Sequence, residues 1–455
     1  MSEVAKVKKK SQSLPVLRAD VAGIDLGSRE HWVCGPPKEG GSPNVRVFGT
    51  TTPQLHALAD WLLGQGVSSV AMESTGVYWI PVYELLESRG VEVVLVNARE
   101  LKYVPGRKTD MQDCQWIRKL HSCGLLRGSF RPDESICVLR ALHRQWENLV
   151  VERSKAVQWM QKALDQMNIQ LHRALRDITG KTGMAILRAI IAGERDPNVL
   201  ATLRDGRCKK TEEEIAEYLT GTWRREHIFN LKTSIAFYDE LEKLIATYEI
   251  ELQAEIEQLQ PSERREQGVP AHPNHQKEIA IRGRGEQSVR ETLWRFAGAD
   301  LTRIDGISAK TAQVVLAEIG TDLRAFPKES SFVSWLRLCP RTAISGGKPV
   351  TKKQKGLGAT RIAGVLRMAA LSLARSHTAL GAYFRRVARK NDGQVAIFAT
   401  ARKLAVYIYR MLRFGQDYVD IGEKAYEHQF QQQRLRGITA SAKSMGYQLV
   451  PIQTK

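Results

Sequence analysis

Several common signatures of function are missing from this sequence of 455 residues. Its six cysteines are scattered without a Cys-x-x-Cys pair, and its ten histidines show neither a His-Glu-x-x-His motif nor zinc-finger spacing. Zinc is therefore not expected, whereas reduced structural thiols are. No run of 18 apolar residues occurs and no apolar core follows the basic N-terminus, which excludes a membrane span and a signal peptide. We expect a cytoplasmic protein without a membrane partner.

Acidic residues are also in short supply, because 49 Asp and Glu stand against 68 Lys and Arg and leave a formal net charge of +19. Such an excess attracts phosphate groups and makes binding depend on salt. The chain is 43% hydrophobic, which is enough for packed cores in the roughly two to four domains that its length suggests. We therefore expect a globular protein with a nucleic-acid partner.

Four carboxylates are placed where a metal site could form. Asp25 ends the strand-like run VAGID and Glu73 ends VSSVAME, so adjacent strands could hold them side by side. Asp110 and Asp113 are three residues apart at the start of a predicted helix, which puts both on one face. Carboxylate oxygens suit Mg²⁺ or Mn²⁺, and two ions about 4 Å apart stabilise the attacking and leaving oxygens of a phosphodiester. Any one acid alone is better explained as a surface or capping residue, but four together favour a metal site.

The order of elements predicts an α/β domain at residues 20–130, after a basic tail at 1–19. Three short strands come first, followed by a helix, a strand, a second helix, a fifth strand and the acidic helix. Antiparallel leading strands followed by strand and helix alternation predict a mixed sheet covered by helices. This order matches an RNase H-like, or RuvC-like, fold.

Longer helical periods begin after residue 130. Apolar residues recur three or four positions apart over 139–171 and 231–259, which predicts a helical or coiled-coil region at 131–260. Packing within one chain and a dimerising coiled coil both explain these stripes. Residues 261–294 lack a sustained apolar period and are rich in polar residues and proline, so we predict a polar linker or insertion.

The rest of the chain is predicted to form a mainly helical domain at 295–420 and a tail at 421–455. Residues 301–320 resemble a helix-hairpin-helix, whose turn can hold a DNA phosphate, although Ser308 replaces the usual second glycine; a plain helical hairpin is the alternative. Tyr407 and Tyr409 lie in an apolar run without the basic and histidine residues of a tyrosine recombinase, so we reject that class. In the tail, a solvated helix and an RNA contact are equally good explanations.

A second chemical signal lies in the segment RTAISGGK. Ser345 precedes two glycines and is surrounded by basic residues, which could favour a serine alkoxide and stabilise a pentavalent phosphorane. On sequence alone, an ordinary phosphate-contacting loop is the better explanation. Residues that could contact nucleic acid are Lys102, Arg107 and Lys108, which a solvated loop explains more simply, and Arg341, Gly346, Gly347, Lys348, Lys352, Lys353 and Arg361. Tyr78 and Trp79 could stack on a base, but their setting favours core packing.

Several stretches resemble the DEDD transposases of the insertion-sequence family numbered 110. They are MESTGVYWIPVYELLE, VNARELKYVPGRKTDMQD with GLLRGSF, and PRTAISGGK with VLRMAALSLARS. The resemblance implies a RuvC-like domain, a coiled-coil region and a C-terminal transposase domain with a catalytic serine. By this resemblance Asp25, Glu73, Asp110 and Asp113 form the metal-binding tetrad, and Ser345 is the nucleophile that becomes joined to a DNA 5′ phosphate.

The resemblance also implies partners for the chain. They are donor and target DNA, a noncoding bridge RNA that selects sequence by base pairing, and further copies of the chain, as a dimer that assembles to a tetramer in a bacterial or archaeal cell. In that arrangement the acidic site of one copy works with the serine domain of another. Two other classes remain open: a RuvC-like endonuclease that uses only the carboxylates and water, and a non-catalytic nucleic-acid-binding scaffold.

Overall fold

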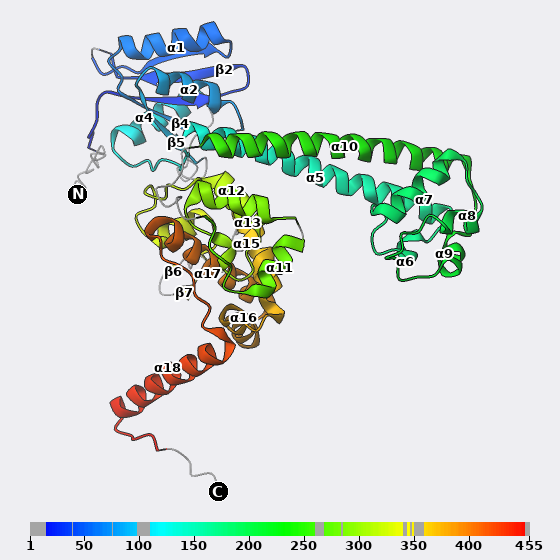
Figure 1. Ribbon diagram of the computed structural model, residues 1–455. Coiled ribbons are helices and arrows are strands. Elements are labelled where there is room, and N and C mark those ends of the chain that lie inside the picture. Colours follow the sequence, from blue (N-terminus) through cyan, green and yellow to red (C-terminus); the bar gives the residue numbers. More distant parts are fainter. Residues whose placement is uncertain are drawn as a thin grey trace, which may run out of the picture. The chain divides into compact units, whose positions relative to one another are not determined.

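The computed structural model describes residues 15–38, 40–74, 76–97, 110–259, 268–283, 285–339, 344–345, 348–349 and 359–450. For Asp110 and for residues 344–345 and 348–349 it describes the backbone alone. Contacts divide the chain into two compact units, Met1–Arg131 and Pro132–Lys455 (Figure 1).

The first unit is built on a five-stranded sheet. Its strands are β1 (Val21–Leu26), β2 (Glu30–Gly35), β3 (Asn44–Gly49), β4 (Ser69–Glu73) and β5 (Glu92–Val96), in the order β3-β2-β1-β4-β5. The first three strands form an antiparallel meander, and β4 and β5 run parallel to β1. The predicted mixed sheet and its RNase H-like arrangement are confirmed.

Helices cover both faces of this sheet because side chains alternate along each strand. Ala22, Ile24 and Leu26 of β1 face one side, where they share a buried core with α1 (Thr52–Gly64) and α2 (Trp79–Ser88). On the other face, Ile117 of α4 (Asp110–Ser122) packs on Ala71 of β4.

A glycine sets the distance between α4 and β1. A Cβ atom at Gly23 would lie 2.3 Å from the backbone nitrogen of Arg118 and 2.5 Å from the carbonyl oxygen of Cys114. Real side chains do not tolerate such contacts with backbone, so only glycine lets the helix lie directly on the strand.

The second unit contains two long antiparallel helices, α5 (Glu134–Gln166) and α10 (Arg225–Gln258). Arg153 of α5 donates to Glu242 of α10 at 2.7 Å, and the Trp146 indole donates to Glu249, so residue numbers rise along one helix as they fall along the other. The two predicted apolar stripes therefore pack on each other within one chain.

Four short helices cap the end of this coiled coil where α5 ends and α10 begins. They are α6 (Leu171–Ala174), α7 (Lys181–Ala192), α8 (Pro197–Ala201) and α9 (Glu212–Leu219). Together with Met160, Leu164, Leu231 and Ile235 of the long helices they enclose one apolar core. α6 occupies the end of the predicted 139–171 stripe because the chain leaves the helix after Gln166, and Asn168 adopts a positive φ of 57°.

The remaining elements form a mainly helical region. They are α11 (His275–Gly283), α12 (Gln287–Ala297), η1 (Leu301–Arg303), α13 (Ala309–Ile319), α14 (Glu329–Trp335), β6 (Ile344–Ser345), β7 (Lys348–Pro349), α15 (Arg361–Ser372), η2 (Leu373–Arg375), α16 (Ala379–Lys390), α17 (Gly393–Phe414) and α18 (Gly422–Ser444).

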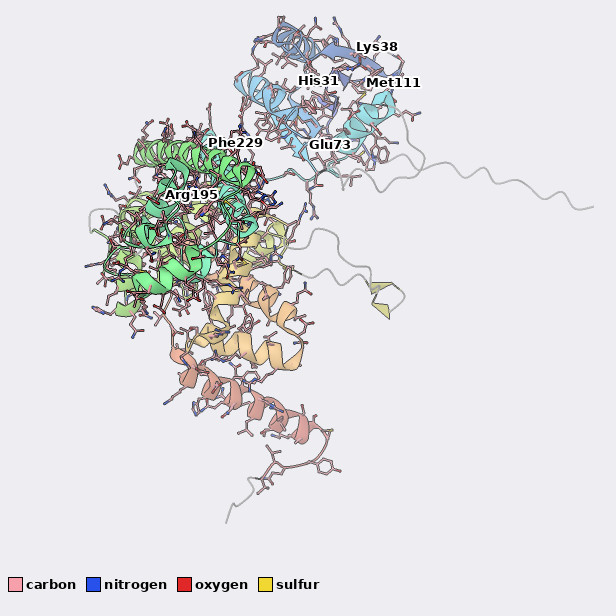
Figure 2. All side chains as sticks on the ribbon, turned by 90° about the vertical axis from the view of Figure 1, so that its right-hand side faces the viewer. His31, Lys38, Glu73, Met111, Arg195 and Phe229 are labelled. Carbon is pink, nitrogen blue, oxygen red and sulfur yellow. The ribbon has the colours of Figure 1, made fainter. Side chains whose placement is uncertain are left out.

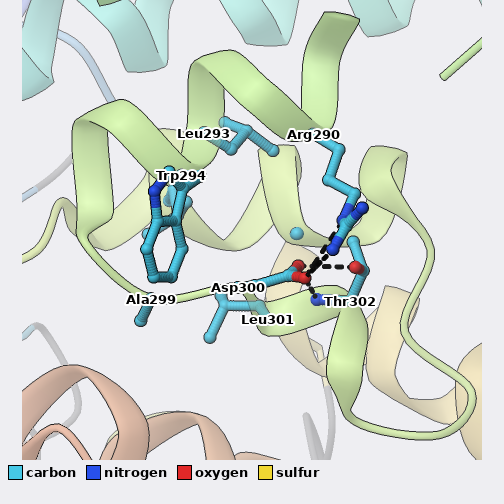
Figure 3. A pocket seen from close by; sticks show the side chains of 9 residues that line it. Arg290, Leu293, Trp294, Ala299, Asp300, Leu301 and Thr302 are labelled. Carbon is cyan, nitrogen blue, oxygen red and sulfur yellow. Dashed lines mark hydrogen bonds and ion pairs between the residues drawn. The ribbon is translucent and has the colours of Figure 1, made fainter. Parts of the chain in front are cut away.

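The structure differs from the predicted polar linker at 261–294, because α11 and most of α12 lie within that range. Arg290 is buried and its guanidinium Nη2 donates to Asp300 at 2.6 Å and to the carbonyl oxygen of Pro270 at 2.7 Å. Thr302 donates from its backbone and its hydroxyl to the same carboxyl group (Figure 3). The charged Arg290, with its partners inside the protein, thus takes a place that an apolar residue would occupy in an ordinary core. For this reason residues 261–294 showed no clear apolar period in the sequence.

The predicted short helix, glycine turn and second helix at 301–320 are present, although the first helix is shorter than in an ordinary helical hairpin. The first helix is the single 3₁₀ turn η1, and Gly306, with a φ of +83°, turns the chain toward α13. The Cα atom of Gly306 lies close to α15, because a Cβ atom on it would lie 3.0 Å from the carbonyl oxygen of Ala369. Ser308 stands in place of glycine because its hydroxyl caps α13 by accepting from the backbone nitrogen of Thr311.

A buried carboxylate joins the coiled coil to this helical region. Glu318 of α13 accepts two hydrogen bonds from Arg144 of α5, at 2.8 and 2.7 Å, and pairs with Arg140 at 3.4 Å. Arg361, the first residue of α15, lies 4.0 Å from the same carboxylate. His143 is buried on the same stretch of α5, and burial lowers its pKa.

The helices and the cysteines of the structure bear on the expectations about membranes and thiols. None of the helices in the described ranges is long and apolar enough to cross a membrane. Each of the six cysteines carries a free thiol.

Replacing Gly23 with Ala should destabilise the first unit by about 3 kcal/mol, because α4 must move off β1 to admit the new methyl group. Urea unfolding of the full chain, followed by tryptophan fluorescence, measures the change. Gly64→Ala is the matched control, since a Cβ there meets no atom within 4 Å. Equal stability of the two variants would refute the packing argument.

Acid should destabilise the second unit through His143. The pKa of His143 in the folded chain lies below the usual value of 6.5. Below pH 6.5 the unfolded chain therefore binds a proton that the folded chain does not, and the free energy of unfolding decreases as the pH is lowered. His143→Gln should reduce the slope of unfolding free energy between pH 6.5 and 5 by up to about 1.4 kcal/mol per pH unit. The exposed His275→Gln is the control, and an unchanged slope in His143→Gln would contradict the assignment.

Candidate functional site

The register of the sheet brings the two strand carboxylates together. Parallel pairing joins Gly23 to Ala71 and Ile24 to Met72, so the next position along both strands sets Asp25 beside Glu73. Alternation along β1 puts Asp25 on the same face as Gly23, the face that α4 covers. Both side chains are half-buried. The adjacency expected from sequence is therefore supported at the level of backbone register.

The direction of α4 decides which end of it meets these acids. Its last turn lies beside the starts of the strands, because the backbone nitrogen of Leu17 donates to Ser122 at 2.8 Å and His121 Nε2 lies 2.8 Å from the Ser69 hydroxyl. Its middle lies on Gly23. The helix therefore runs antiparallel to β1 and β4, and its first turn lies beside the strand ends that carry Asp25 and Glu73.

That first turn carries Asp110, Met111 and Asp113. Glu73 at the end of β4 and Met111 in the first turn of α4 are labelled in Figure 2. Asp113 is half-buried, and the backbone of Asp110 begins the helix. Because backbone N–H groups at a helix start favour negative charge, this end of α4 offsets part of the repulsion among the acids.

A buried pair of thiols lies beside Asp25. Cys34 lies opposite Gly23 on β2, and Cys114 lies over Gly23 on α4; both are buried. The pKa of Cys114 is raised, first by its hydrogen bond with Cys34, then by burial and by the negative charges of Cys34 and Asp25. The influence of Asp25 on Cys114 agrees with the register argument, since it requires the carboxylate to lie near the first turn of α4.

The chemistry of the donors, rather than the placement of their side chains in this structure, suits a hard divalent cation. Asp25, Glu73 and Asp113 supply carboxylate oxygens alone, which suit Mg²⁺ or Mn²⁺ better than softer ions. Among the side chains that the structure describes, no group of three or more His, Cys, Asp or Glu is close enough to hold a metal. The side chain of the fourth predicted ligand, Asp110, lies outside the described residues.

Ser345 belongs to a short antiparallel pair in the second unit. β6 and β7 place it directly opposite Lys348 in the register. The other predicted contacts Lys102, Arg107, Lys108, Arg341, Gly346, Gly347, Lys352 and Lys353 lie outside the described residues. Arg361 is described, and its guanidinium pairs with Glu147 and Glu318, a structural role that the sequence did not indicate.

The aromatic residues considered for function differ in how far they are buried. Tyr409 is buried and donates its hydroxyl hydrogen to the carbonyl oxygen of Phe326 at 2.7 Å, which agrees with the rejection of a tyrosine nucleophile. Tyr407 lies against the ring of Tyr418. Trp79 packs on the core beside Tyr83, but Tyr78 is exposed, so the expectation of core packing was wrong for Tyr78.

Comparison with protein families decides the class of the chain. Residues 22–169 match a model of a DEDD domain described as a transposase, and residues 298–385 match a model described as "Transposase IS116/IS110/IS902 family"; together they cover more than half of the chain. The chain belongs to the IS110 family of transposases. No curated protein matches this IS110-family transposase.

The two matched regions contain both groups of candidate residues. The N-terminal match includes all four predicted acids, and the C-terminal match includes Ser345. The transposase is therefore an enzyme that acts on DNA, and a DEDD domain of RNase H-like fold generally works with divalent metal ions. Sequence reasoning missed the role of Gly23, although a glycine inside an apolar strand signals a close backbone approach.

Replacing Asp25 with Asn should lower metal-dependent DNA cleavage by the transposase at least about 100-fold, because it removes the charge of one of the four predicted metal ligands. A second readout is binding itself: Mn²⁺ at about 100 times its dissociation constant should stabilise the wild type by about 2.7 kcal/mol and the variant much less. Asp60→Asn, an exposed acid on α1, is the control. Full Mn²⁺ stabilisation of Asp25→Asn would remove Asp25 from the site.

Proposed function

We propose that this transposase cuts, exchanges and rejoins donor and target DNA through a 5′-phosphoserine intermediate on Ser345, guided by a noncoding bridge RNA. Asp25, Glu73, Asp110 and Asp113 are the proposed metal ligands. The observation that carries the metal site is the antiparallel course of α4, which brings its acidic first turn to the strand ends of Asp25 and Glu73.

The acids have a defined task in this proposal. Two of them are fixed on strands and two on a helix start, so rigid elements orient every ligand. Divalent ions held there supply charge that stabilises the oxygens of a phosphodiester during displacement. The helix start of α4 and the half-buried setting of the carboxylates keep the ligands oriented and limit access of water.

Ser345 supplies the nucleophile in the proposal. Its Oγ attacks the phosphorus, its proton passes to solvent, the bond from phosphorus to the 3′ oxygen breaks, and that oxygen takes up a proton. The 5′ phosphate remains on the serine, so the bond energy is kept for rejoining. A 3′ hydroxyl of the other DNA then attacks the phosphoserine and restores the serine hydroxyl. Lys348, opposite Ser345 in the register, is a cation available to stabilise the alkoxide and the phosphorane.

The proposed division of labour follows the chain. We assign metal chemistry to residues 20–130, assembly to the helical region 131–260 and serine chemistry to 295–420, with Arg341, Lys348, Lys352 and Lys353 near DNA. Lys102, Arg107 and Lys108 are the proposed contacts beside the acids. Residues 1–19, 261–294 and 421–455 remain outside the proposed chemistry.

The partners of the proposal are DNA, RNA and further copies of the chain. A net charge of +19 supports binding to two nucleic acids at once. The acids and the serine belong to different compact units, which is compatible with the acids of one copy acting with the serine of another in a dimer or tetramer.

A covalent trap tests the chemistry. Purified protein, RNA transcribed from the noncoding flank of the element, labelled donor and target duplexes and Mg²⁺ should give a protein–DNA adduct that survives denaturation. Ser345→Ala and Asp110→Ala should each lose it by at least about 100-fold, since both groups act in the same displacement. Omitting the RNA should also abolish the adduct.

Ser331→Ala, an exposed serine on α14, is the matched control and should form the adduct normally. Metal-dependent cutting without an adduct, unchanged in Ser345→Ala, would instead identify a hydrolytic nuclease. Adduct formation without RNA would refute guidance by RNA.

A further inference from the structure

The C-terminal helix α18 is fixed to the protein by its first turns. The guanidinium of Arg386, on α16, lies 3.8 Å from the ring centre of Phe430 and 5.4 Å from that of Tyr426. Lys403 of α17 lies 5.5 Å from the Tyr426 ring. Glu423 accepts a hydrogen bond from Arg385. Cation–π contacts and an ion pair therefore hold the helix start on α16 and α17.

The rest of the helix presents an apolar seam to solvent. We call residues 431–450 the α18 arm (Figure 1). Leu435, Ile438, Ala442 and Met445 recur at steps of three, four and three residues, the spacing of a coiled-coil seam. Leu435, Ile438 and Met445 are 55%, 44% and 67% exposed. Leu435 is five residues beyond Phe430 and so points away from the docked face.

The charge of the arm limits what can cover this seam. From His428 to the last residue the sequence contains no Asp or Glu, while Arg434 and Lys443 flank the seam. Pairing of two arms would bring these cations together, which costs free energy. A surface that binds the arm should therefore be helical, carry acidic residues and expose apolar side chains.

The coiled coil of the same chain offers such a surface. α10 carries eight acidic residues and three Lys or Arg, in a protein of net charge +19. Phe237, Leu244 and Glu251 recur every seven residues along one line of α10, and Glu240 borders that line. Trp159 of α5 stacks on Phe237, with ring centres 6.0 Å apart.

We call Trp159, Phe237 and Leu244 the coiled-coil stripe. These three side chains are 50%, 40% and 40% exposed. The α10 side of the stripe is bordered by Glu240, which pairs with Lys243, and by Glu251, whereas Lys155 and Lys162 flank Trp159 on α5. The basic arm therefore matches the α10 side of the stripe. In the structure both surfaces are exposed, so the arm is not seated on the stripe of its own chain. We propose that the α18 arm of one copy packs on the coiled-coil stripe of a second copy.

The proposed contact buries apolar side chains from both surfaces and places Arg434 and Lys443 near Glu240 and Glu251 of the second copy. It is heterologous, since two different surfaces meet, so each copy both donates an arm and receives one. The contact rests on the self-association proposed above but is independent of the serine chemistry.

Sedimentation of the full chain without nucleic acid tests the contact. Arg434→Glu with Lys443→Glu should weaken association at least tenfold, and so should Glu240→Lys with Glu251→Lys. An equimolar mixture of the two double variants should recover association. The acidic arm of the first variant then meets the basic stripe of the second, and the unchanged arm of the second meets the unchanged stripe of the first. Recovery also excludes misfolding as the cause of the losses.

Apolar substitutions supply matched controls. Leu435→Ser should weaken association, whereas Val419→Ser, which replaces an exposed residue just before α18, should not. On the receiving side, Leu244→Ser should weaken association, whereas Ile250→Ser, an exposed position of α10 off the stripe, should not.

The outcomes separate the two proposals. A wild type that is monomeric without nucleic acid would overturn the arm contact, whereas the self-association in the proposed function would be overturned only if the chain also stays monomeric with DNA and RNA. Association that the double variants leave unchanged would overturn the arm contact alone. If the Arg434 and Lys443 variant instead loses affinity for RNA or duplex DNA while its association is unchanged, the arm is a nucleic-acid contact and the proposal is wrong.

Discussion

The close approach of α4 to β1 is the constraint on which the candidate metal site depends. At Gly23 the backbone of the helix occupies the space that any side chain would need. This contact fixes the height of the helix above the sheet, and the hydrogen bonds from Leu17 and Arg18 to Ser122 fix its direction. Two acids on strands and two on a helix, distant in sequence, are brought to one edge because backbone lies directly on backbone.

Charge is organised in opposite ways in the two units. In the first, the backbone register sets Asp25 beside Glu73 at the edge where α4 begins, and a bound cation would relieve the repulsion between such carboxylates. In the second, the buried Glu318 is surrounded by Arg140, Arg144 and Arg361, so protein cations do that work. Arrangements of the first kind leave room for a ligand, whereas those of the second kind hold helices together.

The sequence was sufficient for the sheet because its strands are short apolar runs with clear ends, and the mixed topology follows from their order. It was insufficient where polar residues are buried. Arg290 and Asp300 satisfy each other inside the helical region, so residues 261–294 lacked an apolar period although part of them folds into α11 and α12. Arg361 looked like a phosphate contact because nothing local in sequence reveals Glu318 or Glu147. The pairing of Asp25 with Glu73 at neighbouring strand ends was predictable from the sequence, but the close approach at Gly23 that sets the height of α4 above them was not.

The separation of the four acids along the chain has a consequence during synthesis. A nascent chain that has emerged only as far as β5 contains Asp25 and Glu73 but lacks the helix that covers Gly23, and Ser345 is still far from translated. Non-local contacts such as that of α4 with β1 form only after the intervening loop has closed. A chain that ends before Asp110 therefore lacks two of the four acids and the helix that covers Gly23, so the candidate metal site can form only after α4 has been made.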